Sequence, residues 1–262
     1  MTQNPQAGDR VAELTTALAG VRSRLSRAAQ AAGRPVEDIT LLPITKFFPA
    51  SDVAILWRLG CRSFGESREQ EATAKIAEFE RLVPGSEGTD PGGPDPRSAR
   101  WHMVGRIQRN KAKLIARWAD TVHSVSTGRI AAALDEGAAR ALSEGRRSRP
   151  LRVFVQISLD GDTERGGVDI GDRGAVDWLC AQVAESGALD LVGLMAVPPL
   201  GADPDTAFAA LAAEHRRILA AHPAAAELSA GMSGDLEAAV RHGSTCVRVG
   251  TALMGERPLT SP

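Results

Sequence analysis

The stretch ITLLPITKFFPAS, residues 39–51, begins as an apolar run with strand-forming residues and ends at a Phe-Phe-Pro break. Its composition predicts the first strand of an α/β domain and the loop that follows it. An open, doubly wound sheet that binds a dinucleotide prefers a glycine-rich fingerprint directly after its first strand. This stretch contains no glycine, so the sequence favours a closed barrel over the open sheet, which stays as the structural alternative.

Downstream of this strand, short apolar runs alternate with helical patterns. The predicted strands span residues 39–47, 61–65, 100–105, 120–125, 151–158, 189–197, 226–232 and 244–250. The predicted helices between them span residues 50–59, 67–82, 108–118, 127–143, 172–186, 204–221 and 233–242. Such alternation indicates parallel strand pairing, and the number of units predicts an α/β fold with a single (β/α)8 TIM-type barrel.

Two segments lie outside the alternation. Residues 9–32 carry apolar side chains at spacings of three and four before Gly33 and Pro35, which predicts an extra N-terminal helix; these side chains are Val11, Leu14, Leu18, Val21 and Leu25. Residues 83–100 are rich in Gly, Pro, Ser and Asp, which predicts a flexible surface insertion. A domain linker is the competing interpretation, but the alternation continues on both sides, so residues 1–262 are predicted to form one domain.

The composition narrows the classes of partner. The 31 basic and 32 acidic residues are interspersed and give a formal net charge of −1, which disfavours a nucleic-acid-binding face and indicates a small ligand. Cys61, Cys180 and Cys246 form no CxxC pair, so we expect reduced core thiols and no metal site. The first residues lack a signal-peptide pattern and no segment has the apolar length of a membrane span, which predicts a cytoplasmic protein.

Lys46 ends the first predicted strand and is one of only four lysines in the chain. In a barrel, functional side chains collect at the carboxyl ends of the strands. An amine walled by apolar neighbours has a lowered pKa and can form a Schiff base with an aldehyde. The competing interpretation is a lysine that extends along the surface to solvent.

The seventh and eighth strand ends supply candidate phosphate contacts. Ser233 and Gly234 begin a predicted helix, and Gly250 and Thr251 follow the last strand, where barrels of this class commonly hold a phosphate. An ordinary helix N-cap and an ordinary turn are the alternatives, and two acidic residues in the same helical turn, Asp235 and Glu237, favour them.

Arg248 stands between two valines of the last strand, so it points toward the barrel centre or toward the helices. A buried guanidinium needs a partner, either a carboxylate or a ligand. An aldehyde-binding lysine, a phosphate cradle and an inward arginine on one rim describe a site for pyridoxal 5′-phosphate (PLP).

Seven motifs carry a family resemblance: ITKFFPAS, FGESREQEATAKI, WHMVGRIQRNKAKLI, VHSVSTGRIA, VFVQISLDGDTERGGV, LVGLMAVPP and LSAGMSGDLEAAVRHGSTCVRVGTALMGER. In this order, from about residue 10 to residue 257, the chain resembles the YggS/PROSC family of pyridoxal phosphate homeostasis proteins. The resemblance implies a barrel similar to the N-terminal domain of alanine racemase, with PLP held as an internal aldimine on Lys46. It also implies that Ser233, Gly250 and Thr251 contact the phosphate, that Arg248 faces the pyridine nitrogen, and that Met232 lies in the phosphate loop.

The chain departs from the family pattern at Ser67, where the family usually has asparagine after Gly-Glu. The expected contact with the cofactor is then made by a shorter hydroxyl or through water, unless Ser67 is only a helix N-cap. The family's WHxxGxxQxNK pattern matches at His102, Gln108, Asn110 and Lys111, without a chemical role assigned to it. Three weaker candidates for the pocket lining are His123, Gln156 and Met195.

These residues favour binding over catalysis. An arginine at the pyridine nitrogen can only donate a hydrogen bond, so the ring stays unprotonated and is a weak electron sink. The chain has no tyrosine to act as a second base, and we expect one barrel to take up its whole length. The prediction is a PLP homeostasis and delivery protein without catalytic residues, monomeric or weakly dimeric, with PLP-dependent apoenzymes as candidate partners. The alternatives are a weak amino-acid racemase that uses His102 or His123 as a base, and an apo barrel that acts through protein contacts.

Overall fold

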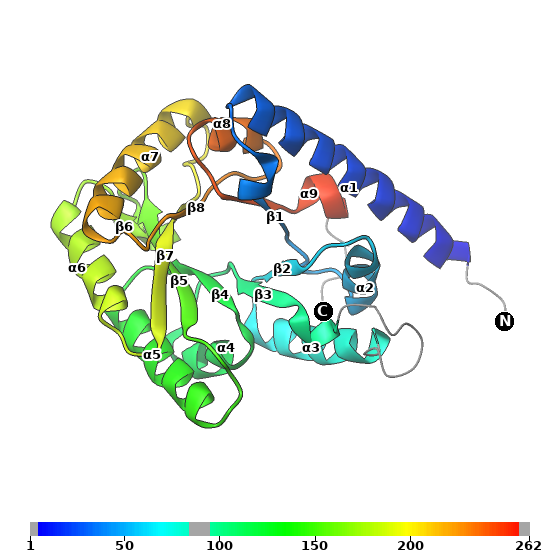
Figure 1. Ribbon diagram of the computed structural model, residues 1–262, viewed down its shortest axis with the longest axis horizontal. Helices are drawn as coiled ribbons and strands as arrows, with labels where there is room; N and C mark the ends of the chain where they lie inside the picture. The colour runs from blue at the N-terminus through cyan, green and yellow to red at the C-terminus, as the bar shows by residue number, and fades with distance from the viewer. Residues whose placement is uncertain (1–4, 84–94, 257–262) are drawn as a thin grey trace.

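The barrel wall is built from parallel strands in the computed structural model, which describes residues 5–83 and 95–256 (Figure 1). These strands are β1 (Thr40–Pro43), β2 (Ser63–Glu66), β3 (Arg100–Met103), β4 (Thr121–Val125), β5 (Leu151–Ser158), β7 (Leu189–Ala196), β8 (Glu227–Ser229) and β9 (Cys246–Val249). Their spatial order is β1-β9-β8-β7-β5-β4-β3-β2. A parallel bridge between Ile44 and Gly65 joins the two ends of this path. The predicted TIM-type barrel is confirmed.

Helices cover the outside of the barrel (Figure 1). They are α1 (Pro5–Ala31), α2 (Ala50–Arg58), α3 (Glu69–Leu82), α4 (Ala112–Trp118), α5 (Gly128–Ser143), α6 (Arg173–Ala184), α7 (Pro204–Ala221), α8 (Leu236–Arg241) and α9 (Thr251–Met254). Short 3-10 helices lie at Val36–Asp38, Pro96–Ser98, Arg109–Lys111 and Thr163–Arg165. Apart from short 3-10 helices, two of the described elements were not predicted, the four-residue α9 and a two-residue strand β6 (Val168–Asp169) that pairs with β5.

Side-chain caps set the start of three outer helices. The side chains of Thr127, Asp172 and Asp203 each accept a hydrogen bond from a backbone N–H three residues later. Each cap satisfies one of the amide donors that a first helical turn leaves without an intrahelical partner, and such a residue contributes about 1 kcal/mol. The polar residues between strand and helix therefore fix where the βα loops end.

Helix α1 packs across α2, α8 and α9 on the outside of the barrel (Figure 1). Its contact stripe is Leu14, Leu18, Val21 and Leu25, each at most 4% exposed. Full burial of such a side chain stabilises the fold by about 1.5–3 kcal/mol. The predicted N-terminal helix is confirmed, although it begins at Pro5 and its Val11 is 44% exposed rather than part of the stripe.

Residues 84–94 of the predicted insertion 83–100 lie outside the described residues, and Arg100 already belongs to β3.

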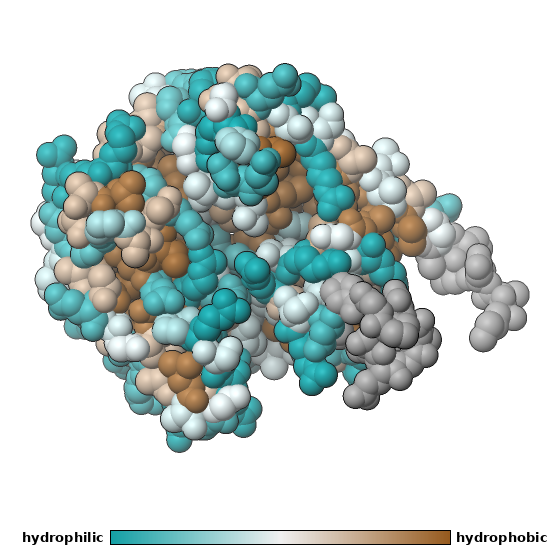
Figure 2. Space-filling model, in the orientation of Figure 1, coloured by the Kyte–Doolittle hydropathy of each residue, from teal (hydrophilic) through white to brown (hydrophobic). Residues whose placement is uncertain are grey.

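The cysteines are buried and free, as predicted, and burial raises the pKa of each thiol. Hydrophilic residues are spread over the face shown in Figure 2. Among the described helices, none combines the length and the apolar character needed to cross a bilayer.

Candidate functional site

A cavity of about 400 Å³ opens at the carboxyl ends of β1 and β9. Six residues predicted from the sequence line it together: Lys46, Met232, Ser233, Arg248, Gly250 and Thr251. The rest of the lining, apart from Gly234 and Gly255, is an apolar wall. Ile44, Phe47 and Phe48 are the expected apolar neighbours of Lys46 in the sequence, whereas Val104 and Val197 were not predicted. The volume is in the range of small-molecule sites, which are typically about 300–1,000 Å³.

Lys46 is the first residue beyond the hydrogen-bonded part of its strand. The N–H of Ile44 donates to Val249 O at 2.9 Å, and the N–H of Thr45 donates to Gly65 O at 3.0 Å. Phe47 then takes a left-handed conformation with φ of 70°, which is strained for a bulky residue. The pairing holds the backbone up to Lys46, and the left-handed residue turns the chain sharply after it.

The other three lysines each face a carboxylate. Lys75 lies 2.6 Å from Glu66, Lys113 lies 2.6 Å from Glu136, and Lys111 lies 3.4 Å from Glu69. None of these three is in the lining of the cavity, whereas Lys46 is. The position of Lys46 at this cavity therefore distinguishes it from every other lysine in the chain.

Ser233 connects the two predicted phosphate loops. Its hydroxyl accepts a hydrogen bond from the backbone N–H of Ala252 at 3.1 Å, in the loop that follows β9. Helix α8 begins at Leu236 and its N-cap is Asp235, so the alternative interpretation of Ser233 as an ordinary N-cap is wrong. The tie holds the β8–α8 and β9–α9 loops side by side.

The nearby acidic side chains are occupied by other contacts. Arg24 of α1 donates two hydrogen bonds of 2.9 Å to Glu237 and a third of 3.1 Å to Ser233 O. The hydrogen bonds from Arg24 hold the pKa of Glu237 below its usual range. The carboxylate of Asp235 accepts from the backbone N–H of Met232 in its own loop. Within the described residues, no Asp or Glu lines the cavity.

Arg248 projects into the barrel interior and is 5% exposed. Its Nη1 donates to Ser229 Oγ at 2.6 Å and its Nη2 donates to Ala196 O at 2.9 Å. Burial lowers its pKa. No carboxylate of the described residues forms an ion pair with this guanidinium. The sequence predicted either an ion pair or a ligand contact for Arg248, and the geometry fits a ligand contact.

Two glycines leave room for an anion close to the backbone. A Cβ built at Gly234 meets no protein atom within 4 Å, and one built at Gly250 meets only Ile44, at 3.7 Å or more. Packing within the protein therefore does not demand glycine at either position. Together with an amine, a guanidinium and two hydroxyls, this open backbone suits a small molecule that carries a phosphate and an aldehyde, as PLP does.

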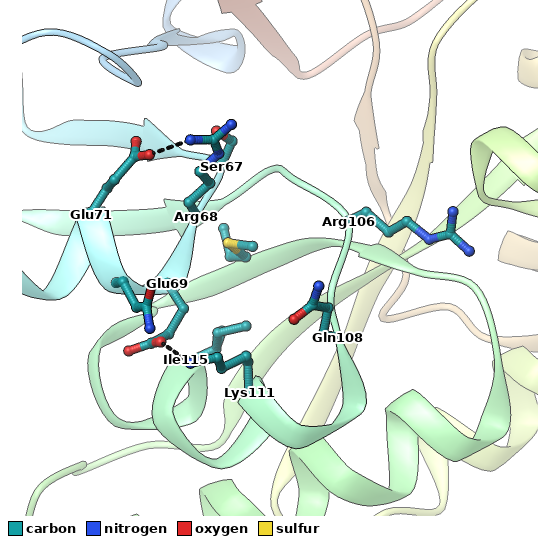
Figure 3. Close-up of a pocket in the computed structure, with 10 residues that line it drawn as sticks. Ser67, Arg68, Glu69, Glu71, Arg106, Gln108, Lys111 and Ile115 are labelled. Carbon is teal, nitrogen blue, oxygen red and sulfur yellow. Dashed lines mark hydrogen bonds and ion pairs between the residues drawn. The ribbon is translucent and has the colours of Figure 1, made fainter. Parts of the chain in front are cut away.

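Ser67 lines a neighbouring cavity of about 470 Å³ and not the one that Lys46 lines (Figure 3). Gln108 and Lys111 of the family pattern lie in the same neighbouring cavity (Figure 3). The N-cap of α3 is Arg68, so Ser67 does not have that role either. The backbone of Ser67 packs on Gly105, where a Cβ would lie 2.1 Å from Ser67 O. A cofactor contact by Ser67 stays a prediction.

The three weaker candidates are also absent from the lining around Lys46. Met195 packs with Phe154 and Val192 in an apolar cluster. Gln156 packs against Gly166. His123 is fully buried and hydrogen-bonded to Ser229 at 2.8 Å. Met195 and His123 are therefore buried away from the cavity, and Gln156 lies against the loop between β5 and β6.

Comparison with known proteins agrees with this geometry. Residues 18–258 match the family of the alanine racemase N-terminal domain. A protein of Mycobacterium tuberculosis named pyridoxal phosphate homeostasis protein is 63% identical over 254 residues, which cover 97% of this chain and 96% of that one. The chain belongs to the pyridoxal phosphate homeostasis protein family. A member of this family from Escherichia coli is 36% identical over 243 residues, or 92% of this chain and 95% of that one.

Solved structures support the same placement. PipY of Synechococcus elongatus, whose structure has PLP bound, superposes with a TM-score of 0.74 at 30% identity, covering 92% of this chain and 100% of that one. Alanine racemase of Corynebacterium glutamicum superposes with a TM-score of 0.59 at 16% identity, and the match covers 97% of this chain but 64% of the racemase. The likeness of this homeostasis-family chain to the racemase is one of fold.

Proposed function

We propose that this protein binds PLP in the cavity at Lys46 and takes part in PLP homeostasis. The observation that carries the proposal is the convergence of Lys46, Ser233, Arg248 and Thr251 on one cavity without an acidic residue in the described lining. The names of its relatives and the PLP bound in the PipY structure support it. PLP supplies an aldehyde that condenses reversibly with amines, so a buffered pool protects other amines from it.

We assign a role to each polar residue of the cavity. Lys46 is the one lysine in the described lining of the cavity, so its amine would form the Schiff base with the aldehyde. The hydroxyls of Ser233 and Thr251 and the backbone at Gly250 hold the phosphate. The guanidinium of Arg248 donates a hydrogen bond to the pyridine nitrogen, because arginine has no acceptor to offer.

The racemase alternative finds less support in these contacts. Neither His102 nor His123, the two candidate bases, lines the cavity. Both are buried, and burial lowers the pKa of both imidazoles. The sequence contains no tyrosine that could act in their place. We therefore favour a protein that holds PLP and releases it to PLP-dependent apoenzymes.

Borohydride reduction followed by peptide mass spectrometry tests the proposal. Wild type incubated with PLP should show the absorption band of a Schiff base, and reduction should fix the cofactor on Lys46. Lys46→Ala should lose the band and keep its fold, whereas Lys113→Ala, which removes an exposed lysine, should keep both. Trapping on Lys75, Lys111 or Lys113, or no band in wild type, would contradict the assignment.

A further inference from the structure

Arg248 is one end of a hydrogen-bonded chain that crosses the barrel interior. From Arg248 on β9, the chain runs 2.6 Å to Ser229 Oγ on β8. It continues 2.8 Å from Ser229 Oγ to His123 Nδ1 on β4, and 2.9 Å from His123 Nε2 to His102 Nδ1 on β3. None of the four side chains is more than 5% exposed. Four strands are thus connected through buried polar side chains in the barrel interior.

The chemistry of arginine gives this chain a direction. A guanidinium only donates, so Ser229 Oγ accepts from Arg248 and is free to donate its own proton to His123 Nδ1. A neutral imidazole carries one N–H, so His123 then donates from Nε2 to Nδ1 of His102. Burial lowers the pKa of His102 to about 4 and lowers that of His123 well below its usual value. Both rings are therefore neutral at pH 7, as this direction requires.

The opposite direction leaves a poorer set of hydrogen bonds. Ser229 would accept from both Arg248 and His123, and the acceptor left for its own proton would be the thiol of Cys246, its cross-strand neighbour on β9. A thiol is a weak acceptor compared with an imidazole nitrogen. His102 Nε2 has no hydrogen-bond partner among the described residues in either direction, so the difference between an imidazole and a thiol as acceptors favours donation from Ser229 to His123.

Packing holds the chain in place. The ring of His123 stacks on Phe154, with centroids 4.6 Å apart and an interplanar angle of 27°. Ser229 then presents its oxygen to Nη1 of Arg248 while Ala196 O accepts from Nη2. Two fixed acceptors define the plane of a guanidinium, whose donors lie in a rigid fork.

We infer that His123 is a positioning residue which, through Ser229, orients the Arg248 guanidinium and so raises the affinity of the cavity for its cofactor. His102 contributes by accepting from His123 Nε2, which keeps the acceptor Nδ1 directed at Ser229. Neither histidine lines the cavity, so their effect on binding is indirect. This inference rests on the proposed function.

PLP titration of three variants tests the inference. His123→Leu removes the acceptor for Ser229 and should raise the dissociation constant for PLP about tenfold. His123→Asn offers an amide oxygen near the position of Nδ1 and should bind within about threefold of wild type. The control His215→Leu removes a histidine whose Nε2 contacts Ala225 O on the barrel exterior, and it should lower the melting temperature without changing PLP affinity. Wild-type affinity in a folded His123→Leu protein would overturn the inference.

Nitrogen-15 NMR of the imidazoles in the apo protein tests the direction of the chain without the cofactor. Both His102 and His123 should carry their proton on Nε2, and a proton on Nδ1 of His123 would overturn the inference. If His123→Leu does not fold, Ser229→Ala breaks the same chain, and unchanged PLP affinity there has the same meaning. Failure of wild type to bind PLP would instead refute the proposed function, while the NMR result on the tautomers would still stand by itself.

Discussion

Replacing Lys75 by methionine should destabilise the protein by about 3–5 kcal/mol near neutral pH. The ammonium donates to Glu66 Oε1 at 2.6 Å and to Thr45 O at 2.8 Å. Lys75 and Glu66 are 8% and 0% exposed, respectively. Methionine keeps most of the apolar stem and removes the charge, so the change leaves a buried carboxylate without its cation.

The contacts that remain around Glu66 set the size of the effect. Thr45 Oγ1 still donates to Oε1 at 2.6 Å, whereas Oε2 accepts no hydrogen bond from any described residue. Burial raises the pKa of Glu66 even with Lys75 beside it, and removal of the cation raises it further. Protonation of the carboxyl then limits the loss, which places the expected value toward the lower end of the range.

Urea unfolding at two pH values measures this loss. A carboxyl whose folded-state pKa lies above its unfolded value loses stabilising free energy as the pH rises through the folded value. The deficit of Lys75→Met relative to wild type should therefore be smaller at about pH 5 than at about pH 8. Lys75→Met/Glu66→Gln should regain much of the stability, and Lys113→Met should change little because its ion pair is exposed. A deficit under about 1 kcal/mol, or one independent of pH, would refute the argument.

Three further predictions test the cavity. Ser233→Ala and Thr251→Ala should each weaken PLP retention about tenfold or more, since a hydrogen bond to a charged group contributes about 1.5–3 kcal/mol. Unchanged retention in the double variant would refute the assignment of these hydroxyls to the phosphate. Arg248→Glu should weaken binding and shift the absorption band, because a carboxylate can accept an N–H from the ring; D-alanine formation by the wild type would instead favour the racemase alternative. Gly234→Leu should reduce PLP retention without unfolding the protein. The control Gly187→Leu, at another glycine where a Cβ would meet no atom within 4 Å, should retain PLP normally. Equal retention in both variants would contradict an open cradle at Gly234.

Alternation of strand and helix made the fold predictable. Each barrel strand is an apolar run next to a helical pattern, and both signals are local in the sequence. The elements that were missed, β6 and α9, are too short to show a period. Val11 was misplaced because spacing alone does not say how far along a helix the neighbouring surface extends; the stripe on α1 begins only at Leu14.

The site was predictable where it depends on strand ends. Lys46 and Arg248 could be placed on one rim because parallel strands of a barrel present their carboxyl ends on the same side. Which side chains contact each other across the barrel interior could not be predicted in this way. His123 and Ser229 are 106 residues apart, and their contact depends on side-chain directions within the closed barrel. Ser67 follows its strand as expected, but the packing on Gly105 places it at a different cavity.

The pairing of β1 with β9 has a consequence for synthesis of the chain. The strand that leads to Lys46 pairs along its length with the last strand, from Thr40 and Cys246 to Pro43 and Val249, and β2 adds a bridge at Ile44. During translation the lysine emerges long before these partners, so no nascent chain short of β9 can assemble the cavity. Until then β1 has an open edge, which is the kind of edge that recruits other strands and leads to aggregation. Emergence of β9 is therefore the step at which the chain completes the cavity and covers the edge of β1.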